Sequence, residues 1–384
     1  MTSNKQNRTV LFYAPIGNLT KGFKNGGAEA GCRKTMEVLR KEGYNVILLE
    51  KPTRISDSKL DGFKFIFTLA NVYFRTIGLL RAHREGVFHV AGFYLNQVYF
   101  EWLLIQTARL MSVKSIYEIR NGGMIEAYKQ GGSFYKWFMK GILTGASTVL
   151  CQGYEYVLFL KSEFGKSGVY YPNYIMDNFV QSNSDDRSDD AVIRIVYFGR
   201  VVPDKNVEFI IAVCKQLAIR NKDFTMAIIG GYEQQYYDFL QQQILSNGLD
   251  SERFVFHGRR EFSEIVPHLR KSHFFIFPSK EKREGHSNSL TEAMGCGVVP
   301  IVSTAGFNES IAGSSDFVVN EFNADLYAEK VLRIWDTGNW KSRSDEVHRR
   351  VVQNYTESVV KTSLLGAYAD LLGRSAKNEL TLSR

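Results

Sequence analysis

The sequence is poor in cysteine and proline and has no long uninterrupted apolar run. Its 384 residues include 4 cysteines and 7 prolines, and no C-x-x-C pair occurs, which excludes a thioredoxin-type motif and a zinc site of ordinary spacing. Lys64, Arg75 and Glu101 interrupt the apolar stretches 63–80 and 98–105, so neither has the roughly 20 clean residues of a transmembrane helix. We expect no membrane span, no signal peptide in the short apolar run 9–14, and the reduced cysteines of a cytoplasmic protein.

What remains is the composition of a soluble enzyme. Apolar residues make up 44% and charged residues 23%, values near the globular average, which exclude collagen-like, disordered and disulfide-scaffold classes. At roughly 150 residues per domain, the length favours two domains.

Charge is distributed unevenly between the two halves. Residues 1–180 carry 23 Lys and Arg against 13 Asp and Glu, a net charge of +10, so the total of +8 leaves −2 for residues 181–384. A basic half indicates an anionic partner such as an acidic membrane surface or a phosphorylated lipid, although a generally basic soluble surface is the plain alternative. No zinc finger or RNA-binding aromatic motif accompanies the charge, so we expect no nucleic acid partner.

Short β-branched and aromatic runs alternate with helix-length segments along the whole chain. The runs are residues 9–14, 45–49, 87–92, 115–119 and 148–151, then 193–199, 225–230, 254–258, 274–278, 298–302 and 317–319. Near-continuous apolar strands of this kind are typical of parallel sheets covered on both faces. They predict an α/β fold of two doubly wound Rossmann-like domains, which bind ligands at the carboxyl ends of their strands.

The polar stretch 181–190 lacks periodicity and is typical of a linker. We therefore expect an N-terminal domain over residues 1–180 and a C-terminal domain over 191–355. Residues 356–384 form a tail that contains an expected amphipathic helix over 358–372. The sequence leaves open whether this helix packs on the C-terminal domain or returns to the N-terminal one.

Two loops after strands carry phosphate-binding signals. Gly26 and Gly27 precede an expected helix, 30–41, where backbone N–H groups and the helix dipole favour an anion. Gly199 and Arg200 end the first strand of the second half, and Lys205 follows; two cations at a strand end suit a diphosphate. An ordinary glycine loop and ordinary surface cations are the competing interpretations.

The segment 284–300 has the strongest chemical signal. Glu284 and Glu292 flank the start of a helix, and carboxylates there would accept hydrogen bonds from sugar hydroxyls while helix-start amides bind phosphate. The alternative for Glu292 is a capping box with Ser289, and for the His286 imidazole a structural role. The backbone groups of this candidate site belong to Gly285, His286, Ser287, Asn288, Ser289 and Leu290.

Over residues 9–372 the chain resembles the family 4 retaining glycosyltransferases, because five motifs occur in that family's order. They are Gly26-Gly27-Ala28-Glu29, Tyr171-Pro172-Asn173, the turn from Gly199-Arg200 to Lys205, the run from Glu284 to Glu292, and Thr304-Ala305-Gly306-Phe307-Asn308-Glu309. The resemblance implies a GT-B fold whose two domains face an interdomain cleft, with the acceptor held mainly by the N-terminal domain and the nucleotide-diphosphate sugar mainly by the C-terminal one.

The resemblance also implies roles for single residues. Arg200 and Lys205 would neutralise the diphosphate, Glu284 would contact donor-sugar hydroxyls and Glu292 the ribose, with amides near Gly27 and Ser289 completing the site. The sequence lacks an Asp-x-Asp motif, so no metal is expected. Where many family members have a histidine, this chain has Arg120, which is assigned either to the donor or an anionic acceptor, or to a structural turn.

We therefore expect a retaining glycosyltransferase without cofactor or metal, using a UDP-sugar and a saccharide or polyprenyl-diphosphate-linked acceptor in surface polysaccharide biosynthesis. A same-face reaction is favoured over double displacement, since no well-placed nucleophile presents itself. The expected location is cytoplasmic, peripheral on the inner face of the membrane. The alternatives are a GT-B-shaped sugar-nucleotide epimerase and a non-catalytic sugar-nucleotide or nucleic-acid binding module.

Overall fold

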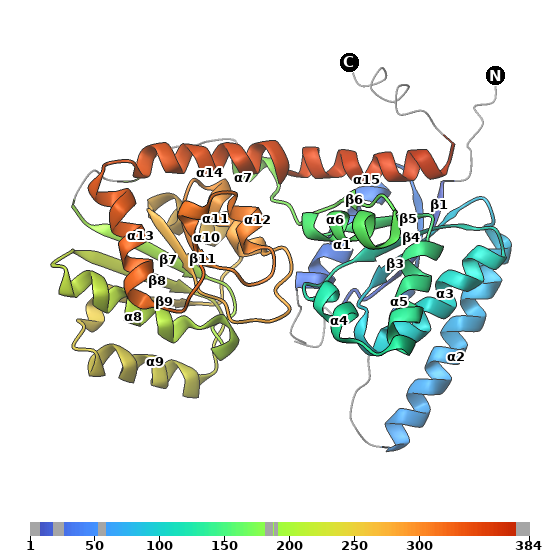
Figure 1. Cartoon of the computed structure of the whole chain (residues 1–384), viewed down its shortest axis with the longest axis horizontal. Helices are drawn as coiled ribbons and strands as arrows, with labels where there is room; N and C mark the ends of the chain where they lie inside the picture. Colours follow the sequence, from blue (N-terminus) through green and yellow to red (C-terminus); the bar gives the residue numbers. More distant parts are fainter. Residues whose placement is uncertain (1–7, 18–26, 53–58, 181–186, 188–190, 374–384) are drawn as a thin grey trace, which may run out of the picture. The chain divides into compact units, whose positions relative to one another are not determined.

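The computed structural model describes residues 8–17, 27–52, 59–180, 187 and 191–373 (Figure 1). They form two compact units. Unit 1 comprises Met1–Pro172 and Lys361–Arg384, and unit 2 comprises Asn173–Val360. The two parallel sheets with covering helices confirm the predicted α/β class of two doubly wound domains.

The unit boundaries differ from the expected ones at residues 180, 191 and 355. The chain enters unit 2 directly after Pro172, because the Ile175 N–H donates to the Tyr355 carbonyl at 2.9 Å and Asn173 Nδ2 donates to the His286 carbonyl at 2.7 Å. Arg187, inside the stretch expected to be a linker, is buried and donates to the Cys296 carbonyl at 2.7 Å. The rest of that stretch lies outside the described residues.

Unit 1 contains one six-stranded parallel sheet in the order β2-β1-β3-β4-β5-β6. All six residues of β1 and of β3 are buried, as the continuous apolar runs predict. The strand missed by the sequence pattern, β6, has two residues and is too short to show periodicity. The strands are β1 (Thr9–Ala14), β2 (Asn45–Glu50), β3 (Val87–Gly92), β4 (Lys114–Ile119), β5 (Thr148–Cys151) and β6 (Val169–Tyr170).

Helices connect the strands of unit 1, and the end of the last helix among the described residues packs with them. On α15 (Glu357–Leu371), the Tyr368 hydroxyl lies 2.7 Å from His89 Nδ1 in the core of unit 1, and Lys361 pairs with Glu42. The other helices are α1 (Gly27–Lys41), α2 (Lys59–Ala82), η1 (Leu95–Gln97), α3 (Val98–Leu110), α4 (Met124–Gln130), α5 (Ser133–Gly145) and α6 (Tyr154–Phe164).

One helix of the described residues, in α2, is long and apolar enough to cross a membrane by length and composition. We expected Lys64 and Arg75 to leave too few clean apolar residues, but the 21-residue stretch Gly62–Ala82 is apolar enough to qualify by this measure. Only 11% of its most apolar window is buried, so α2 is no ordinary core helix.

Unit 2 contains the second six-stranded parallel sheet, in the order β12-β11-β10-β7-β8-β9. β7 and β10 are neighbours, so the loops that follow them meet at one edge of the sheet. The strands are β7 (Ile193–Phe198), β8 (Phe224–Ile229), β9 (Phe254–Gly258), β10 (Phe274–Phe277), β11 (Val299–Ser303) and β12 (Val318–Val319). The helices are α7 (Asp177–Val180), η2 (Pro203–Lys205), α8 (Val207–Ile219), α9 (Gln234–Ser246), η3 (Ser251–Arg253), α10 (Phe262–Lys271), α11 (Asn288–Gly295), α12 (Asn308–Ala312), η4 (Ser315–Phe317), α13 (Ala324–Asp336) and α14 (Trp340–Asn354).

Candidate functional site

The loop after β7 begins with a glycine that its conformation requires. Gly199 has φ +145°, a conformation that residues with side chains rarely adopt. A Cβ atom on Gly230 would lie only 1.7 Å from the Gly199 carbonyl oxygen. Both glycines are therefore needed for the ends of β7 and β8 to lie this close. Ser289 Oγ would lie 3.9 Å from a Cβ on Gly199, so this loop also meets the start of α11.

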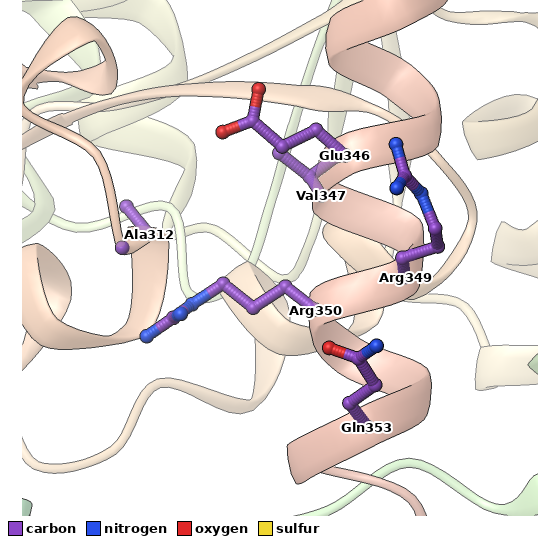
Figure 2. A pocket seen from close by; sticks show the side chains of 7 residues that line it. Ala312, Glu346, Val347, Arg349, Arg350 and Gln353 are labelled. Atoms are coloured by element: carbon purple, nitrogen blue, oxygen red, sulfur yellow. The ribbon is translucent and has the colours of Figure 1, made fainter.

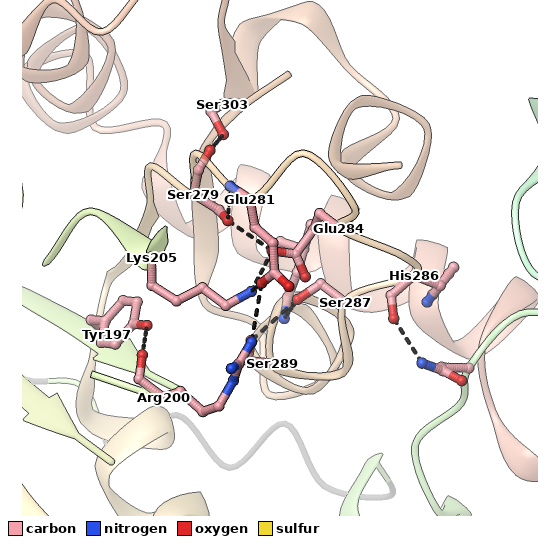
Figure 3. Close-up of polar contacts among 12 residues, drawn as sticks. Tyr197, Arg200, Lys205, Ser279, Glu281, Glu284, His286, Ser287, Ser289 and Ser303 are labelled. Carbon is pink, nitrogen blue, oxygen red and sulfur yellow. Dashed lines mark hydrogen bonds and ion pairs between the residues drawn. The ribbon is translucent and has the colours of Figure 1, made fainter. Parts of the chain in front are cut away.

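Lys205 is the centre of a polar cluster at the carboxyl ends of β7 and β10 (Figure 3). Its Nζ lies 2.5 Å from Glu284 Oε2 and 2.6 Å from Glu281 Oε2, while its side chain is only 9% exposed. A lysine this buried requires paired carboxylates, and both come from the loop after β10. We call Arg200, Lys205, Ser279, Glu281 and Glu284 the Lys205 cluster.

The Glu284 carboxylate is fixed from two sides. It accepts hydrogen bonds from Lys205 and, at 2.7 Å, from the Ser279 hydroxyl. A Cβ on Gly306, which has φ +58°, would lie 2.0 Å from the Glu284 carbonyl, so the turn before α12 packs directly against this loop. The carboxylate is consequently held in one position before any ligand arrives.

Arg200 is the open member of the Lys205 cluster. Its guanidinium lies 3.2 Å from Glu281 Oε2 and its side chain is 61% exposed, while its backbone is held by the Tyr197 hydroxyl, which donates to the Arg200 carbonyl at 2.7 Å. Burial alone would raise the pKa of Glu281, but hydrogen bonds and charge from Lys205, with Arg200, hold that pKa below its ordinary value. Glu281 is therefore ionised and bridges the two cations.

The start of α11 borders the same cluster. The Ser287 side chain caps the helix by accepting from the Leu290 N–H at 3.3 Å, and Ser289 lies inside the helix, so the alternative of a capping box from Ser289 to Glu292 does not apply. The Ser287 and Ser289 hydroxyls lie 3.2 Å apart. Glu292 is half-buried in the helix. The first N–H groups of any helix lack intrahelical partners, which makes this end suited to an anion.

The other residues predicted for this loop have mixed surroundings. Gly285, Asn288 and Ser289 are half-buried, whereas the Leu290 side chain is fully buried in the core and contributes only its backbone. The His286 imidazole is 3% exposed and packs at 5.0 Å against the Tyr355 ring, and burial followed by the charge of Arg350 lowers its pKa to about 3. His286 is thus neutral near pH 7.

Unit 1 holds the remaining predicted site residues in a different setting. Gly27 is the exposed first residue of α1, which begins earlier than expected, and Gly26 lies outside the described residues. Arg120 is buried: its guanidinium lies 2.7 Å from Glu118 Oε1 and donates to Thr35 Oγ1 at 2.5 Å, and a Cβ on Gly31 would collide with it.

Further partners close this buried site around Arg120. His89 Nε2 lies 3.2 Å from Glu118 Oε2, and the guanidinium lies 5.8 Å from the centre of the Tyr171 ring. Burial alone would raise the pKa of Glu118, but Arg120 and His89 hold it below its ordinary value. We call Thr35, His89, Glu118, Arg120 and Tyr171 the Arg120 cluster.

The structure thus brings together Arg200, Lys205, Glu284 and the start of α11 in unit 2, and places Gly27 and Arg120 in unit 1. Sequence reasoning missed Glu281, although its spacing of three from Glu284 after a buried strand was a usable signal. Ser279 was also missed. In the part of the chain that the structure describes, no group of three or more His, Cys, Asp or Glu is placed to hold a metal ion.

Two cavities of unit 2 lie outside the Lys205 cluster. One, of about 230 Å³, is lined by residues of α12 and α14 and by Gly313 (Figure 2). Its Arg350 donates to the Ser310 carbonyl at 2.6 Å and to the Ile311 carbonyl at 2.8 Å, so the guanidinium joins two helices. The other, of about 590 Å³, borders η4, β12 and α13. Neither includes a residue of the cluster.

The segment that carries the Lys205 cluster is similar to known proteins. Residues 193–337 match the family described as glycosyl transferases group 1. An uncharacterized glycosyltransferase of Methanocaldococcus jannaschii is 28% identical over 35% of this chain and 33% of its own. The capsular polysaccharide biosynthesis glycosyltransferase CapM of Staphylococcus aureus is 21% identical over 55% of each chain. The matches thus span a third to about half of these curated relatives.

Among solved structures, HepE of Anabaena in complex with UDP has a TM-score of 0.71 at 16% identity, covering 94% of this chain and 100% of that one. At this identity the likeness shows the fold, which is that of the GT-B glycosyltransferases, as the sequence resemblance implies.

Proposed function

We propose that the chain, whose residues 193–337 match the glycosyl transferases group 1, transfers a sugar from a UDP-sugar to a saccharide or lipid-linked oligosaccharide acceptor. The observation that carries the proposal is the Lys205 cluster, which lies inside the matched segment at the strand ends where open parallel sheets bind ligands. UDP bound to HepE supports the choice of base, and the name of CapM supports an acceptor in polysaccharide biosynthesis.

The cluster suits the departure of a nucleoside diphosphate. As the bond from the sugar to the β-phosphate oxygen breaks, negative charge develops on the diphosphate, and fixed cations stabilise it without reorganisation. Lys205 is held rigidly by two carboxylates, and Arg200 is exposed and able to turn toward a ligand. The start of α11 adds oriented backbone N–H groups.

Glu284 fits the role of a contact to donor-sugar hydroxyls. A carboxylate accepts hydrogen bonds from hydroxyl groups, and this one is fixed by Lys205 and Ser279, so it would hold the sugar in one orientation. In this proposal the reaction needs no metal, and it retains the anomeric configuration by attack on the face from which the diphosphate leaves. A phosphate oxygen of the leaving group takes the acceptor proton.

The donor site is tested by thermal denaturation of the purified protein with UDP, GDP or ADP, each with EDTA and with Mg²⁺. Because a ligand that binds the native state raises Tm, we expect UDP to raise it most and EDTA to leave the shift unchanged. The matched variants are Arg200→Ala, which should reduce the shift, and Lys222→Ala, whose cation pairs with Asp336 and should leave it intact. The absence of a shift with all three nucleotides would contradict the donor assignment.

Retention is tested separately by proton NMR of the first product formed from a UDP-sugar and a saccharide acceptor. The proposal predicts that the new linkage keeps the donor's anomeric configuration. An inverted linkage would refute retention and leave the donor site standing.

A further inference from the structure

Helix α2 leaves most of its length uncovered by unit 1. Near its end, Thr76 and Leu80 are fully buried, and the Tyr73 hydroxyl lies 3.0 Å from Thr107 Oγ1 of α3. From Gly62 to Arg75 no residue is buried, and Figure 1 shows this part of α2 (light blue) extending beyond α3 and α5. The helix is therefore anchored at one end and exposed along the rest.

The exposed part carries large apolar side chains on one side. Phe63, Ile66, Phe67 and Phe74 are 66%, 61%, 75% and 69% exposed. Spacings of three, four and seven residues place them on a common helix face, which we call the α2 stripe. Water contact with four such side chains is unfavourable, and a contiguous apolar face of this kind marks an interaction site.

The charges around the α2 stripe are mainly positive. Lys64, Arg75, Arg81 and Arg84 are exposed, and no Asp or Glu lies between residues 62 and 84, although Asp61 and Glu85 flank this range. This cationic edge complements an anionic surface and opposes docking of a second copy of the same face, which would bring like charges together.

A second exposed group of the same composition lies on the helices beside α2. On α3 and α5, Tyr99, Phe134 and Trp137 are 44%, 68% and 56% exposed, although their rings also contact α3–α5 neighbours. α5 contributes Lys136 and Lys140 and no acidic residue. Exposed aromatic rings with flanking lysines are typical of protein surfaces at a membrane interface.

We propose that α2, with the exposed edge of α5, binds the surface of an anionic lipid bilayer. The helix lies in the interface plane, with the α2 stripe against the acyl chains and its cations among lipid phosphates. A transmembrane orientation would put Arg75 deep in the hydrocarbon, where a charge is costly, and would pull Thr76 and Leu80 out of the core of unit 1.

The proposal concerns binding and is independent of sugar transfer, so it is tested by vesicle sedimentation of the full chain. The vesicles are phosphatidylcholine alone, and phosphatidylcholine with about a third phosphatidylglycerol. We expect binding to the anionic vesicles that weakens at least about tenfold when salt is raised from 50 mM to 500 mM, and little binding to the neutral ones. Equal binding to both kinds, or binding to neither, would overturn the proposal.

Two variants separate the apolar and the charged contributions. Phe63→Ser with Phe67→Ser, and Lys64→Glu with Arg75→Glu, should each reduce the bound fraction by about tenfold or more. Their side chains are exposed, so the far-UV circular dichroism and Tm should stay unchanged. The matched control, Phe239→Ser with Leu245→Ser, removes two exposed apolar side chains of α9 in unit 2 and should bind as the unmodified protein does.

A protein partner is the outcome that would replace the bilayer. If the unmodified chain forms dimers in solution that Phe63→Ser with Phe67→Ser abolishes, while vesicle binding is unaffected by the same change, the α2 stripe is a protein interface and the proposal fails.

Discussion

The two units place arginine-carboxylate clusters at the ends of their sheets in opposite states of exposure. In unit 1 the side chains of Arg120 and Glu118 are 4% and 3% exposed, whereas in unit 2 those of Arg200 and Glu281 are 61% and 28% exposed. The charged side chains of the Arg120 cluster are paired with one another within unit 1, although the buried Arg120 Nε has no hydrogen-bond partner among the described residues. The Lys205 cluster combines a rigid buried cation with an exposed one that, in the part of the chain that the structure describes, is paired only with Glu281, so only the second cluster has a cation within reach of a ligand. A cation at a strand end is therefore a binding residue only where its own unit leaves it open.

Breaking the closed cluster should cost the most. Arg120→Met leaves Glu118 charged and buried with His89 as its remaining neighbour, so we expect a loss of about 3–5 kcal/mol in the free energy of unfolding, measured by urea denaturation. Arg120→Met combined with Glu118→Gln should recover part of the loss, because no lone charge remains. A fully stable Arg120→Met protein with impaired acceptor binding would instead return Arg120 to the binding site.

In the open cluster the largest effect should be on turnover. Glu284→Gln keeps the shape of the side chain but removes the charge that orients Lys205 and the donor sugar, so we expect kcat to fall by ~100-fold or more while the protein stays folded. The matched control is Asp336→Asn, which breaks the exposed pair with Lys222. Near-normal turnover in Glu284→Gln would remove Glu284 from the site.

The pH dependence of stability tests whether the His286 imidazole is shielded from water. Its pKa falls from 6.5 to about 3 on folding, so only the unfolded chain takes up this proton as the pH falls from 6.5 toward 3. The stabilising contribution is complete above pH 6.5 and is lost at up to about 1.4 kcal/mol per pH unit below it. His286→Gln should flatten this part of the stability profile. An unchanged slope would show that the imidazole reaches solvent.

Arg200→Ala tests the contribution of the exposed cation of the Lys205 cluster to ligand binding. Its guanidinium is solvated, so we expect affinity for UDP to fall by about fivefold, less than the tenfold of a buried charge-assisted hydrogen bond. Titration calorimetry with UDP and with uridine measures the effect, and uridine binding should be unchanged. An equal loss for both ligands would refute a role at the diphosphate.

The smallest expected effect is an increase in affinity for UDP. Glu281 neutralises Arg200 and Lys205 when no ligand is bound, so Glu281→Gln should tighten UDP binding by about two- to threefold, since one competing carboxylate is removed. The same calorimetric titration measures it, with Glu208→Gln as the carboxylate control. Weaker binding in Glu281→Gln would mean that Glu281 positions the cations and does not compete for them.

The sequence predicts most of the fold because buried parallel strands occur in it as apolar runs. β1, β3 and β10 begin at the residues where the predicted runs begin. It also places Arg200, Lys205 and Glu284 at one edge, since consecutive α/β units put their loops there. It does not reveal that Arg120 is closed off, because Thr35 and His89 come from distant segments of the chain. Nor does it show that the apolar run in α2 lacks cover, since hydropathy alone does not identify the partners of a helix.

The path of the chain has a consequence for how the protein is made. Unit 2 is continuous from Asn173 to Val360, but unit 1 takes its last helix segment, with Tyr368 beside His89, from beyond it. A ribosome therefore releases every residue of unit 2 before it finishes unit 1. The sheet of unit 1 therefore lacks its contacts with the α15 segment until all of unit 2 has been synthesised. A product truncated before Lys361 would lose a piece of the first unit while keeping the whole of the second.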